Sequence, residues 1–439
     1  MGTTILLGII SIGILIFIHE LGHFIAARAS GISVEVFSIG WGKGILSFKW
    51  KETKVQIGWI PFGGYCKMAG DSPRDVLSGR PDEYYSSSPL KRILVASCGP
   101  ISNYIFAVLL FTLIIIIGYE IRTFPNKIVL ASSEETLFSG QVTPARRAGF
   151  MDGDIILYIN GVKINNWDDI TEQIVRNPLR SLEVTVLRGT ELKKLFVIPE
   201  LDEETGRGLI GIHPWVEPIV GGVLPDQPAQ RAGIKEGDRI VSVDGIPIRH
   251  HVDFYEAIRG KSWKDVSLTI QRGDSLLEVN IMPEKVDDYD SAGLFFKQLT
   301  YHSEHYTLPV AIEKGWIKSF VGIKDTIRGI GLVLSGRVRA RSAVAGPARL
   351  IYISGMIARE GFIYFLQVMS YISLAFFVMN LIPFPALDGS HIVISLFEII
   401  SGRKPNLEVI YKIQTFGFIF LIVVLIFITM NDISSFFGR

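Results

Sequence analysis

An apolar segment near the start of the chain carries a cluster of ionisable residues. Residues 4–27 have the sequence TILLGIISIGILIFIHELGHFIAA. This length can cross a bilayer, which takes about 20 mostly apolar residues. Ionisable side chains at membrane depth are costly, and they are rare there unless they serve a function. The cluster His19-Glu20-Leu21-Gly22-His23 therefore indicates a membrane helix with a chemical role.

The spacing of this cluster fits a metal ion. On a helix, residues i and i+4 lie on one face, so the imidazoles of His19 and His23 can reach one Zn²⁺. Glu20 lies beside them, where its carboxylate can take a proton from metal-bound water. In a chain with this histidine content the pattern arises by chance about once in 100. A polar cluster that binds a neighbouring helix is the alternative.

The composition of the whole chain indicates a membrane protein. Its 439 residues are 48% hydrophobic, and the mean hydropathy is +0.35. The net charge is +1, whereas nucleic-acid-binding domains are usually basic, so that class of protein is set aside. Cys66 and Cys98 match neither a metal-binding spacing nor a disulfide framework, and we expect them to be free, buried thiols.

Four segments are long and apolar enough to span a bilayer. They are residues 4–27, 93–119, 362–382 and 413–430. The first has no basic residue before Arg28, and no small-residue cleavage site follows its apolar run. We therefore expect a retained helix there rather than a signal peptide.

Basic residues near the ends of the spans predict the orientation of the chain. They are frequent between residues 28 and 92 and again between residues 403 and 412. Both loops are expected on the cytoplasmic side, which leaves the two termini and residues 120–360 outside. Five arginines between residues 337 and 359 argue the other way. We give them less weight, because long translocated regions cross largely regardless of charge.

An internal repeat lies between the second and third spans. Pro144-Ala-Arg-Arg-Ala-Gly149 recurs 84 residues later as Pro228-Ala-Gln-Arg-Ala-Gly233. Each copy is expected to contain strands, Asn-Gly or Asp-Gly turns and one short helix. The predicted strands are residues 155–159, 183–187, 240–243 and 266–270, and the predicted helices are residues 168–175 and 253–258.

Both copies resemble PDZ domains of the bacterial protease-associated type, through an Ala-Gly-x-x-x-Gly-Asp-x-Ile core and the turn that follows it. In that type, a Gly-Leu-x-Gly-Ile strand forms the peptide-binding edge. Here this strand follows the core, at Gly208-Leu-Ile-Gly-Ile212, which indicates a circularly permuted version. The resemblance implies that Gly208, Leu209 and Gly211 bind peptide C-termini. The second copy has Gly293-Leu-Phe-Phe296, which matches the first at an offset of 85 and lacks the next glycine.

Two further segments are expected at the membrane surface. Residues 315–338 are apolar at helical spacing, and they can form an amphipathic helix on the outer face or pack against the repeats. Residues 48–60 alternate apolar and polar across a Lys-Glu-Thr-Lys turn, which predicts a β-hairpin near the inner surface. The residues expected on one face of this hairpin are Phe48, Trp50, Val55, Ile57 and Trp59.

Catalytic zinc generally has three protein ligands and an open water position. The candidate third ligand is Asp388, in Asn380-Leu-Ile-Pro-Phe-Pro-Ala-Leu-Asp-Gly389 at the cytoplasmic end of the third span. Two prolines break the helix there, and irregular backbone at membrane depth survives only where it is buried in protein or lines a watery cavity. His391 is a rival ligand, and a helix C-cap with a solvated Asp388 is the structural alternative.

Taken together, the two motifs resemble those of the site-2 protease family of intramembrane metalloproteases. The two PDZ-like repeats are similar to those of its bacterial regulator-of-sigma-E protease subgroup, and the resemblance covers nearly the whole chain. It implies one Zn²⁺ per chain, bound by His19, His23 and Asp388, with Glu20 as the catalytic base.

The resemblance also implies how substrate is held. Asn380 is expected to bind the substrate backbone near the scissile bond, although it could instead only cap the broken helix. Gly63 and Gly64 resemble a glycine segment that follows the family's membrane-reentrant β-element, and Trp59 lies just before them. A membrane helix hides its peptide bonds in its own hydrogen bonds, whereas a hairpin edge can hold an unwound segment by strand addition. We therefore expect these residues to contact substrate.

The predicted fold is a multi-pass α-helical membrane protein with four transmembrane helices, a membrane-associated β-hairpin and two β-rich PDZ-like domains between the second and third helices. The expected location is the bacterial cytoplasmic (inner) membrane, with the active site toward the cytoplasm. The predicted parts are residues 1–119 (N-terminal membrane part), 120–214 (first PDZ-like domain), 215–300 (second PDZ-like domain), 301–360 (amphipathic linker) and 361–439 (C-terminal membrane part).

The expected activity is that of an endopeptidase that cuts transmembrane segments of single-span membrane proteins. By resemblance, its expected substrates are anti-sigma factors already trimmed by another protease and remnant signal peptides. A membrane adaptor with a vestigial metal site is the main alternative, and the intact set of His19, Glu20, His23 and Asp388 argues against it. A transporter with an intramembrane ion site is also compatible with four spans and a broken third helix.

Overall fold

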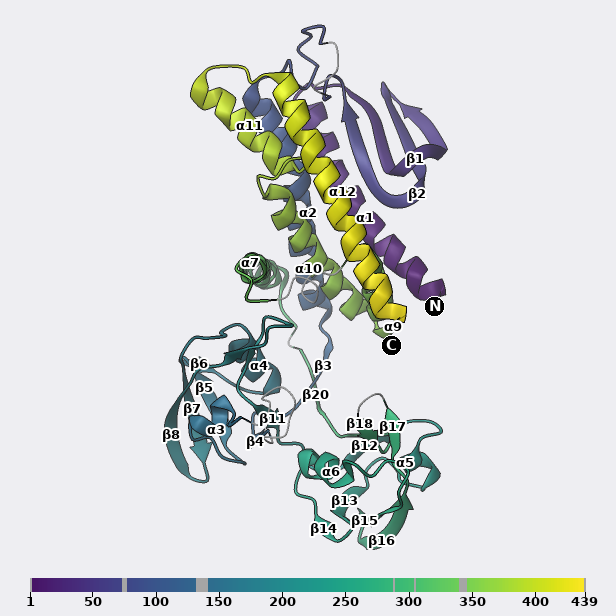
Figure 1. Ribbon diagram of the computed structural model, residues 1–439, viewed down its shortest axis with the longest axis vertical. Coiled ribbons are helices and arrows are strands. Elements are labelled where there is room, and N and C mark those ends of the chain that lie inside the picture. The colour runs from purple at the N-terminus through teal and green to yellow at the C-terminus, as the bar shows by residue number, and fades with distance from the viewer. Residues whose placement is uncertain are drawn as a thin grey trace. The chain divides into compact units, whose positions relative to one another are not determined.

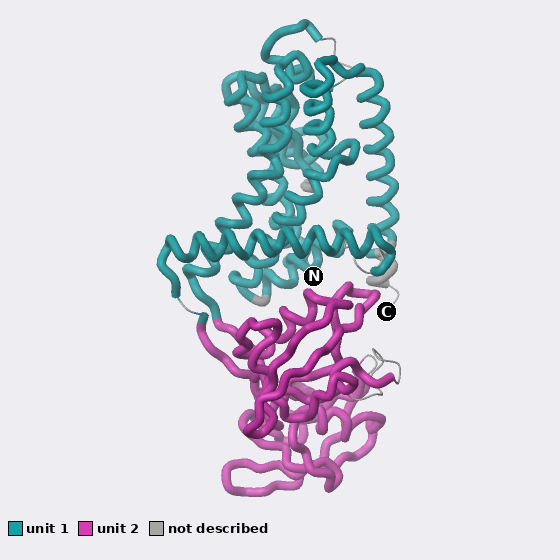
Figure 2. The backbone as a smooth tube through the Cα atoms, turned by 90° about the vertical axis from the view of Figure 1, so that its left-hand side faces the viewer, with its two compact units in different colours: residues 1–119, 303–439 teal, residues 120–302 magenta. Residues whose placement is uncertain are grey.

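The computed structural model describes residues 2–72, 77–131, 141–286, 289–303, 305–338 and 346–437. The chain divides into two compact units (Figure 2). Unit 1 comprises Met1–Tyr119 and Ser303–Arg439, and unit 2 comprises Glu120–His302.

Unit 1 contains the four predicted spans. Among the described residues, four helices are long and apolar enough to cross a membrane. The second ends two residues earlier than predicted because Gly118, at φ +69°, stops it. The helices are α1 (Gly2–Ala29), α2 (Pro89–Ile117), α10 (Phe362–Leu381) and α12 (Leu407–Phe437), and α11 (Asp388–Ser401) lies between the last two.

Small residues let the helices of unit 1 approach closely. A Cβ atom added to Gly22 on α1 would lie 2.3 Å from the carbonyl oxygen of Cys98 on α2. A Cβ atom on Gly355 of α9 (Pro347–Glu360) would lie 1.7 Å from the carbonyl oxygen of Thr4 on α1. Close backbone contact is a common way for membrane helices to pack. Helix α2 therefore lies against the face of α1 that carries His19 and His23.

Helix α7 (Leu308–Leu334) crosses the direction of the long helices and is seen end-on in Figure 1. Its small residues face α2 and α10: a Cβ on Gly315 would lie 2.5 Å from Thr112 Oγ1, and one on Gly322 would lie 2.6 Å from Leu374 Cδ1. Its large apolar residues, including Trp316, are exposed. The predicted amphipathic helix is therefore present, and it packs on the membrane helices.

The predicted hairpin is the tip of a longer one. Strands β1 (Val34–Trp50) and β2 (Thr53–Met68) meet at a turn where Lys51 has φ +55°. Phe37 pairs with both Val55 and Cys66, so the first half of β1 lies between the two halves of β2. The predicted apolar face is largely exposed, with Phe48 at 64% and Trp59 at 63%. Such a face suits a membrane surface.

Unit 2 contains two lobes, each with its own apolar core (Figure 1). In the first lobe a four-stranded sheet has the order β6-β5-β7-β8 and is accompanied by α4; in the second, β14-β13-β15-β16 is accompanied by α6. The predicted strands and helices of the repeat are confirmed. The bounds are β5 (Ile155–Ile159), β6 (Val162–Lys163), α4 (Trp167–Val175), β7 (Leu182–Arg188), β8 (Glu191–Val197), β13 (Arg239–Val243), β14 (Ile246–Pro247), α6 (His251–Ile258), β15 (Val266–Arg272) and β16 (Ser275–Ile281).

Shorter elements complete both lobes. Antiparallel pairs join β4 with β11, β9 with β10, β12 with β19, β17 with β18 and β3 with β20. The bounds are β3 (Glu120–Thr123), β4 (Ile128–Leu130), α3 (Pro144–Arg147), β9 (Glu200–Leu201), β10 (Gly208–Leu209), β11 (Ile212–Pro214), β12 (Val220–Val223), α5 (Pro228–Arg231), β17 (Glu284–Val286), β18 (Tyr289–Ser291), β19 (Leu294–Phe296) and β20 (Leu299–His302).

One predicted correspondence between the repeats is wrong. The counterpart of Gly293 is Gly211, at an offset of 82, and not Gly208 at 85. The Gly211 carbonyl accepts a hydrogen bond from the Ala131 amide, as the Gly293 carbonyl does from the Leu224 amide, and both glycines have positive φ. Before this glycine the second copy is two residues shorter than the first. The Gly-Leu dipeptides that the two copies share are therefore not at equivalent positions. The second copy therefore retains the glycine that it was expected to lack.

Candidate metal centre

Three potential ligands converge from two helices of unit 1. His19 and His23 lie one turn apart on α1, as their spacing predicts. Asp388 is the first residue of α11, so the alternative of a helix C-cap at this position is wrong. Gly389 allows the chain to turn back here, because a Cβ on it would lie 2.3 Å from the carbonyl oxygen of Ile382.

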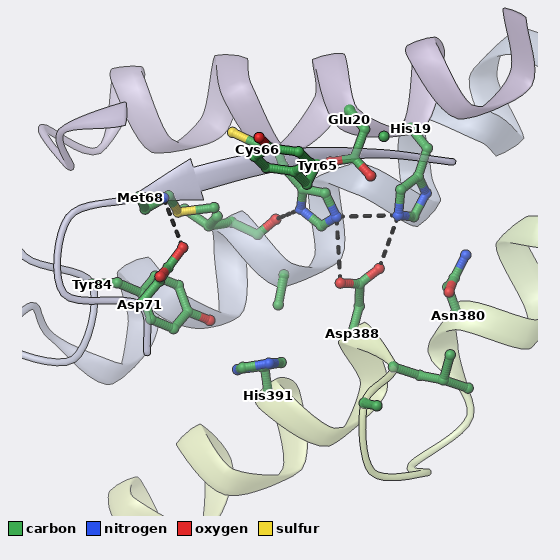
Figure 3. Close-up of a pocket in the computed structure, with 16 residues that line it drawn as sticks. His19, Glu20, Tyr65, Cys66, Met68, Asp71, Tyr84, Asn380, Asp388 and His391 are labelled. Atoms are coloured by element: carbon green, nitrogen blue, oxygen red, sulfur yellow. Dashed lines mark hydrogen bonds and ion pairs between the residues drawn. The ribbon is translucent and has the colours of Figure 1, made fainter. Parts of the chain in front are cut away.

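The ligand atoms form a small triangle (Figure 3). His19 Nε2 lies 3.1 Å from Asp388 Oδ2, and His23 Nε2 lies 3.3 Å from Asp388 Oδ1. The two imidazole Nε2 atoms are 3.2 Å apart. A tetrahedral site with zinc–ligand distances of about 2.0–2.2 Å has its ligand atoms about 3.3–3.6 Å apart. The three observed distances are close to that range, and each histidine faces a different oxygen of Asp388.

The hydrogen bonds around the triangle favour a cation at its centre. His23 Nδ1 donates to the carbonyl oxygen of Val95 at 2.9 Å, which leaves its Nε2 with a free lone pair. Asp388 Oδ2 is buried and has no hydrogen-bond partner among the described residues, although His19 Nε2 is near. Lone pairs that face one another in a buried site are unfavourable unless a cation lies between them. The residues therefore fit a zinc ion.

Helix α2 makes room for this arrangement. A Cβ atom on Gly99 would lie 2.2 Å from His23 Nε2, so only glycine leaves space for the imidazole. Asn103, one turn farther along α2, is fully buried, and its side-chain amide lies 3.2 Å from His19 Nδ1. In the sequence, the small and polar residues of Gly99-Pro100-Ile101-Ser102-Asn103 within the second span are the signal for these two contacts, but their partners cannot be inferred without the fold.

Glu20 lies between the histidines and strand β2. A Cβ on Gly64 would lie 3.2 Å from Glu20 Cγ, and the backbone amide of Cys66 hydrogen-bonds the Glu20 carboxylate. In Figure 3 this carboxylate lies on the same side of α1 as His19. The proposed base and the edge of the hairpin are therefore in direct contact.

A cavity of about 360 Å³ surrounds the three ligands. Of the residues predicted to bind substrate in unit 1, Asn380 and Gly64 line this cavity, whereas Trp59 and Gly63 are not among its lining residues: Trp59 packs over Gly42, and Gly63 packs beneath Trp41. The lining residues are His19, Glu20, His23, Gly64, Tyr65, Cys66, Met68, Asp71, Tyr84, Val95, Ala96, Asn380, Ala386, Leu387, Asp388 and His391.

His391 lines the cavity but lies outside the ligand triangle. Its Nε2 lies 3.2 Å from Gln414 Nε2, and its ring packs edge-on against Tyr84. The structure thus brings Asp388, rather than this rival, to the two histidines. Burial raises the pKa of the Tyr84 hydroxyl and of the Cys66 thiol, so both groups are neutral near pH 7. Both cysteines are free, as expected, but they are only partly buried.

The glycines predicted to bind peptides line a separate cavity in unit 2. It has a volume of about 200 Å³ and lies between α4 and strands β10 and β11. Its walls are mainly apolar and include Trp167, Ile170 and Val175 together with Gly208, Leu209 and Gly211. We call this cavity the first-lobe groove.

Comparisons with known proteins agree with the geometry of the metal centre. The profile of peptidase family M50 matches residues 7–424. A relative from Treponema pallidum is 29% identical over 99% of both chains, and one from Neisseria meningitidis is 30% identical over 99% of this chain and 100% of its own. Both carry names of candidate zinc metalloproteases.

A third relative, the regulator of sigma-E protease of Escherichia coli, is 29% identical over 97% of both chains. A solved PDZ domain from Listeria monocytogenes matches 19% of this chain and 90% of its own, with 22% identity and a TM-score of 0.17. The family profile covers nearly the whole chain, including the metal centre, so the chain belongs to peptidase family M50 and is an intramembrane zinc metalloprotease.

Proposed function

We propose that the chain is an endopeptidase that hydrolyses peptide bonds within transmembrane segments of single-span membrane proteins. In this proposal His19, His23 and Asp388 hold one zinc ion and Glu20 is the catalytic base. The observation that supports it most is the convergence of two histidines of the apolar helix α1 with Asp388 of α11, directly beside the edge of a β-hairpin.

The residues around the metal centre have distinct roles in this proposal. A zinc ion held by His19, His23 and Asp388 would polarise the substrate carbonyl and lower the pKa of a bound water toward about 7. The carboxylate of Glu20 accepts a proton from that water and delivers it to the leaving amine. Asn380, at the end of α10 and on the wall of the cavity, binds the substrate backbone.

The hairpin edge holds the substrate in an extended form. The segment from Gly64 to Met68 pairs with β1 on one side and contributes Gly64, Tyr65, Cys66 and Met68 to the cavity wall. A substrate helix must unwind before its peptide bonds can be attacked, and an unwound segment can add to this edge as a further strand. Trp59 and Gly63 then act by shaping the hairpin, since they pack on Gly42 and Trp41.

The PDZ-like domains, residues 120–214 and 215–300, select what reaches the metal centre. The apolar first-lobe groove suits the C-terminus of a peptide, and the substrates that we propose are the trimmed anti-sigma factors that the family resemblance implies. We place the protein in the bacterial inner membrane as a four-span protein. Its termini and PDZ-like domains lie outside, and its metal centre lies toward the cytoplasm, in keeping with the Lys and Arg residues of its loops.

Single-turnover cleavage of model transmembrane substrates by the purified chain tests the proposal. The unchanged chain should cut, and Glu20→Gln should bind zinc normally but cut about 10²–10⁴-fold more slowly, because it lacks the base. If both bind zinc and neither cuts any of several helices, the protease proposal is wrong. A membrane adaptor that uses only the groove would then be the better explanation.

A further inference from the structure

Asn103 is a buried polar residue that the mechanism above does not use. It lies on α2 inside the second span and has no exposed surface. Its backbone carbonyl accepts a hydrogen bond from the hydroxyl of Ser373 on α10 at 2.8 Å, so the residue is fixed between two membrane helices. Its side-chain Nδ2 lies 3.2 Å from His19 Nδ1, while its Oδ1 is buried without a hydrogen-bond partner among the described residues.

The chemistry of a metal-binding imidazole decides which amide atom should face His19. A neutral imidazole carries one proton, so when Nε2 offers its lone pair to a metal, Nδ1 carries the hydrogen and is a donor. The Asn103 Nδ2 group is also a donor, whereas the unpaired Oδ1 of the same amide is an acceptor. A half-turn of the amide about the Cβ–Cγ bond exchanges the two atoms and gives His19 the acceptor that it needs.

His23 provides an internal comparison. Its Nδ1 already has an acceptor, the carbonyl oxygen of Val95, which belongs to the same helix α2. Metal-bound histidines almost always donate their second ring N–H to such a partner, and this contact fixes the tautomer and the ring orientation. Val95 and Asn103 are eight residues apart on α2, and each lies against one of the two histidines.

We propose that Asn103 is a positioning residue for the metal centre: in the metal-bound protein its Oδ1 accepts a hydrogen bond from His19 Nδ1. This inference rests on the proposed ligand set. It assigns α2 the task of orienting both histidines, one through a backbone carbonyl and the other through a side-chain amide. Asn103 does not touch the substrate.

The test compares variants that keep or remove the acceptor. Asn103→Asp retains an oxygen that can accept a hydrogen bond from His19 but lacks the amide donor. Asn103→Leu has a similar shape and has neither a hydrogen-bond acceptor nor a donor. Ser102→Ala is the matched control, because the hydrogen bonds of the Ser102 hydroxyl in the described structure go to the carbonyl oxygens of Ile18 and Gly99 at the same helix interface rather than to either histidine. Zinc affinity of the full chain in detergent is measured by competition with a chelator. The visible absorption spectrum of the Co²⁺-loaded chain reports the geometry of the site.

Loss of such a partner typically weakens metal binding about 10–100-fold. We expect Asn103→Leu to fall in this range with an altered Co²⁺ spectrum, and Asn103→Asp and Ser102→Ala to bind zinc no more weakly than the unchanged chain. The inference is overturned if Asn103→Leu binds zinc normally, or if Asn103→Asp is as weak as Asn103→Leu, because the amide donor would then be the active group.

Two controls keep these outcomes interpretable. Thermal unfolding of the metal-free chains shows whether each variant folds, and if Asn103→Leu does not, Asn103→Ala removes the same acceptor with less bulk. His19→Ala tests the ligand set itself. If His19→Ala keeps full zinc affinity, the proposed ligand set fails; if it loses zinc while Asn103→Leu does not, only the role of Asn103 fails.

Discussion

The metal centre of unit 1 and the first-lobe groove of unit 2 are cavities with opposite chemistry. The metal centre is lined mainly by ionisable and polar side chains, which are held by a hydrogen bond from His23 to a carbonyl oxygen of α2 and by a break in the chain before α11. The groove is lined mainly by apolar side chains and exposed backbone between a short helix and strand edges. A polar, preorganised site suits bond cleavage, whereas an apolar slot with backbone groups suits recognition of peptides.

From this difference we expect hydrolysis of the peptide bond and recognition of the substrate to depend on separate parts of the chain. Every residue proposed to act on the peptide bond lies in unit 1, and every residue proposed to recognise a C-terminus lies in unit 2. Changes to one cavity should therefore leave the direct function of the other intact, and the following variants test that separation.

Removal of the third ligand should have the largest effect. Asp388→Asn lacks the negative charge and one of the two carboxylate oxygens that face the histidines, and we expect zinc affinity to fall more than about 100-fold and cleavage to be lost. His391→Ala, at a residue that lines the same cavity outside the triangle, is the control and should retain zinc. Metal analysis after dialysis measures both. Full zinc in Asp388→Asn together with loss in His391→Ala would reverse the assignment of the third ligand.

A single methyl group at Gly99 should displace a ligand. Gly99→Ala places a Cβ in the space now taken by the His23 imidazole, and we expect zinc affinity to fall about 10–100-fold. Gly329→Ala is the matched control on α7, where a Cβ meets no atom within 4 Å. Peptide binding by unit 2 should be unchanged in both variants. Normal zinc affinity in Gly99→Ala would show that α2 can shift to accommodate the added methyl group.

The second lobe of unit 2 should be sensitive to mild acid. Burial lowers the pKa of His251 to about 4, with smaller contributions from His213 and His250. The unfolded chain has the ordinary histidine pKa near 6.5, so it binds more protons than the folded lobe between pH 6.5 and 4. Stability should therefore fall by about 1–3 kcal/mol as the pH is lowered through this window, and the loss should level off below it.

Hydrogen exchange of α6, followed by mass spectrometry at pH 7 and pH 5, measures this change in stability. His251→Phe should remove most of the acid sensitivity, and His302→Phe, at an exposed histidine of β20, should not. Equal acid sensitivity in the unchanged chain and in His251→Phe would mean that other groups account for it.

A charge in the groove should have the smallest effect. Val175→Arg introduces the residue that the second copy has at the equivalent position, Arg259. We expect binding of a fluorescent peptide that ends in Val-Ala-Ala to weaken about 10-fold, since a cation in an apolar slot costs about 1.4 kcal/mol or more. Leu192→Arg adds the same charge to an exposed position of β8 and should bind normally. Equal weakening in both variants would place the peptide elsewhere.

The sequence predicted the parts of this protein that depend on local pattern. Hydropathy located the four spans, helical spacing placed His19 and His23 on one face, and a constant offset identified the repeat. Each of these signals lies within a few turns or strands of the chain, so no knowledge of the tertiary structure is needed to detect it.

Features that depend on distant contacts were missed or misassigned. The contact of Asn103 with His19 joins residues 84 apart, and nothing in the second span alone shows which histidine it faces. The double pairing of Phe37 arises because β2 folds back on both sides of β1. The correspondence of Gly293 with Gly211 became clear only from backbone hydrogen bonds, because a two-residue deletion shifts the register of the similar dipeptides.

The central claim is that His19, His23 and Asp388 bind the zinc ion while Cys66 and His391 only line the cavity. X-ray absorption at the zinc edge of the purified full chain tests this claim most directly. We expect only nitrogen and oxygen neighbours at about 2.0–2.2 Å, with outer-shell scattering from two imidazole rings. A sulfur neighbour at about 2.3 Å, or scattering from three imidazole rings, would contradict the account.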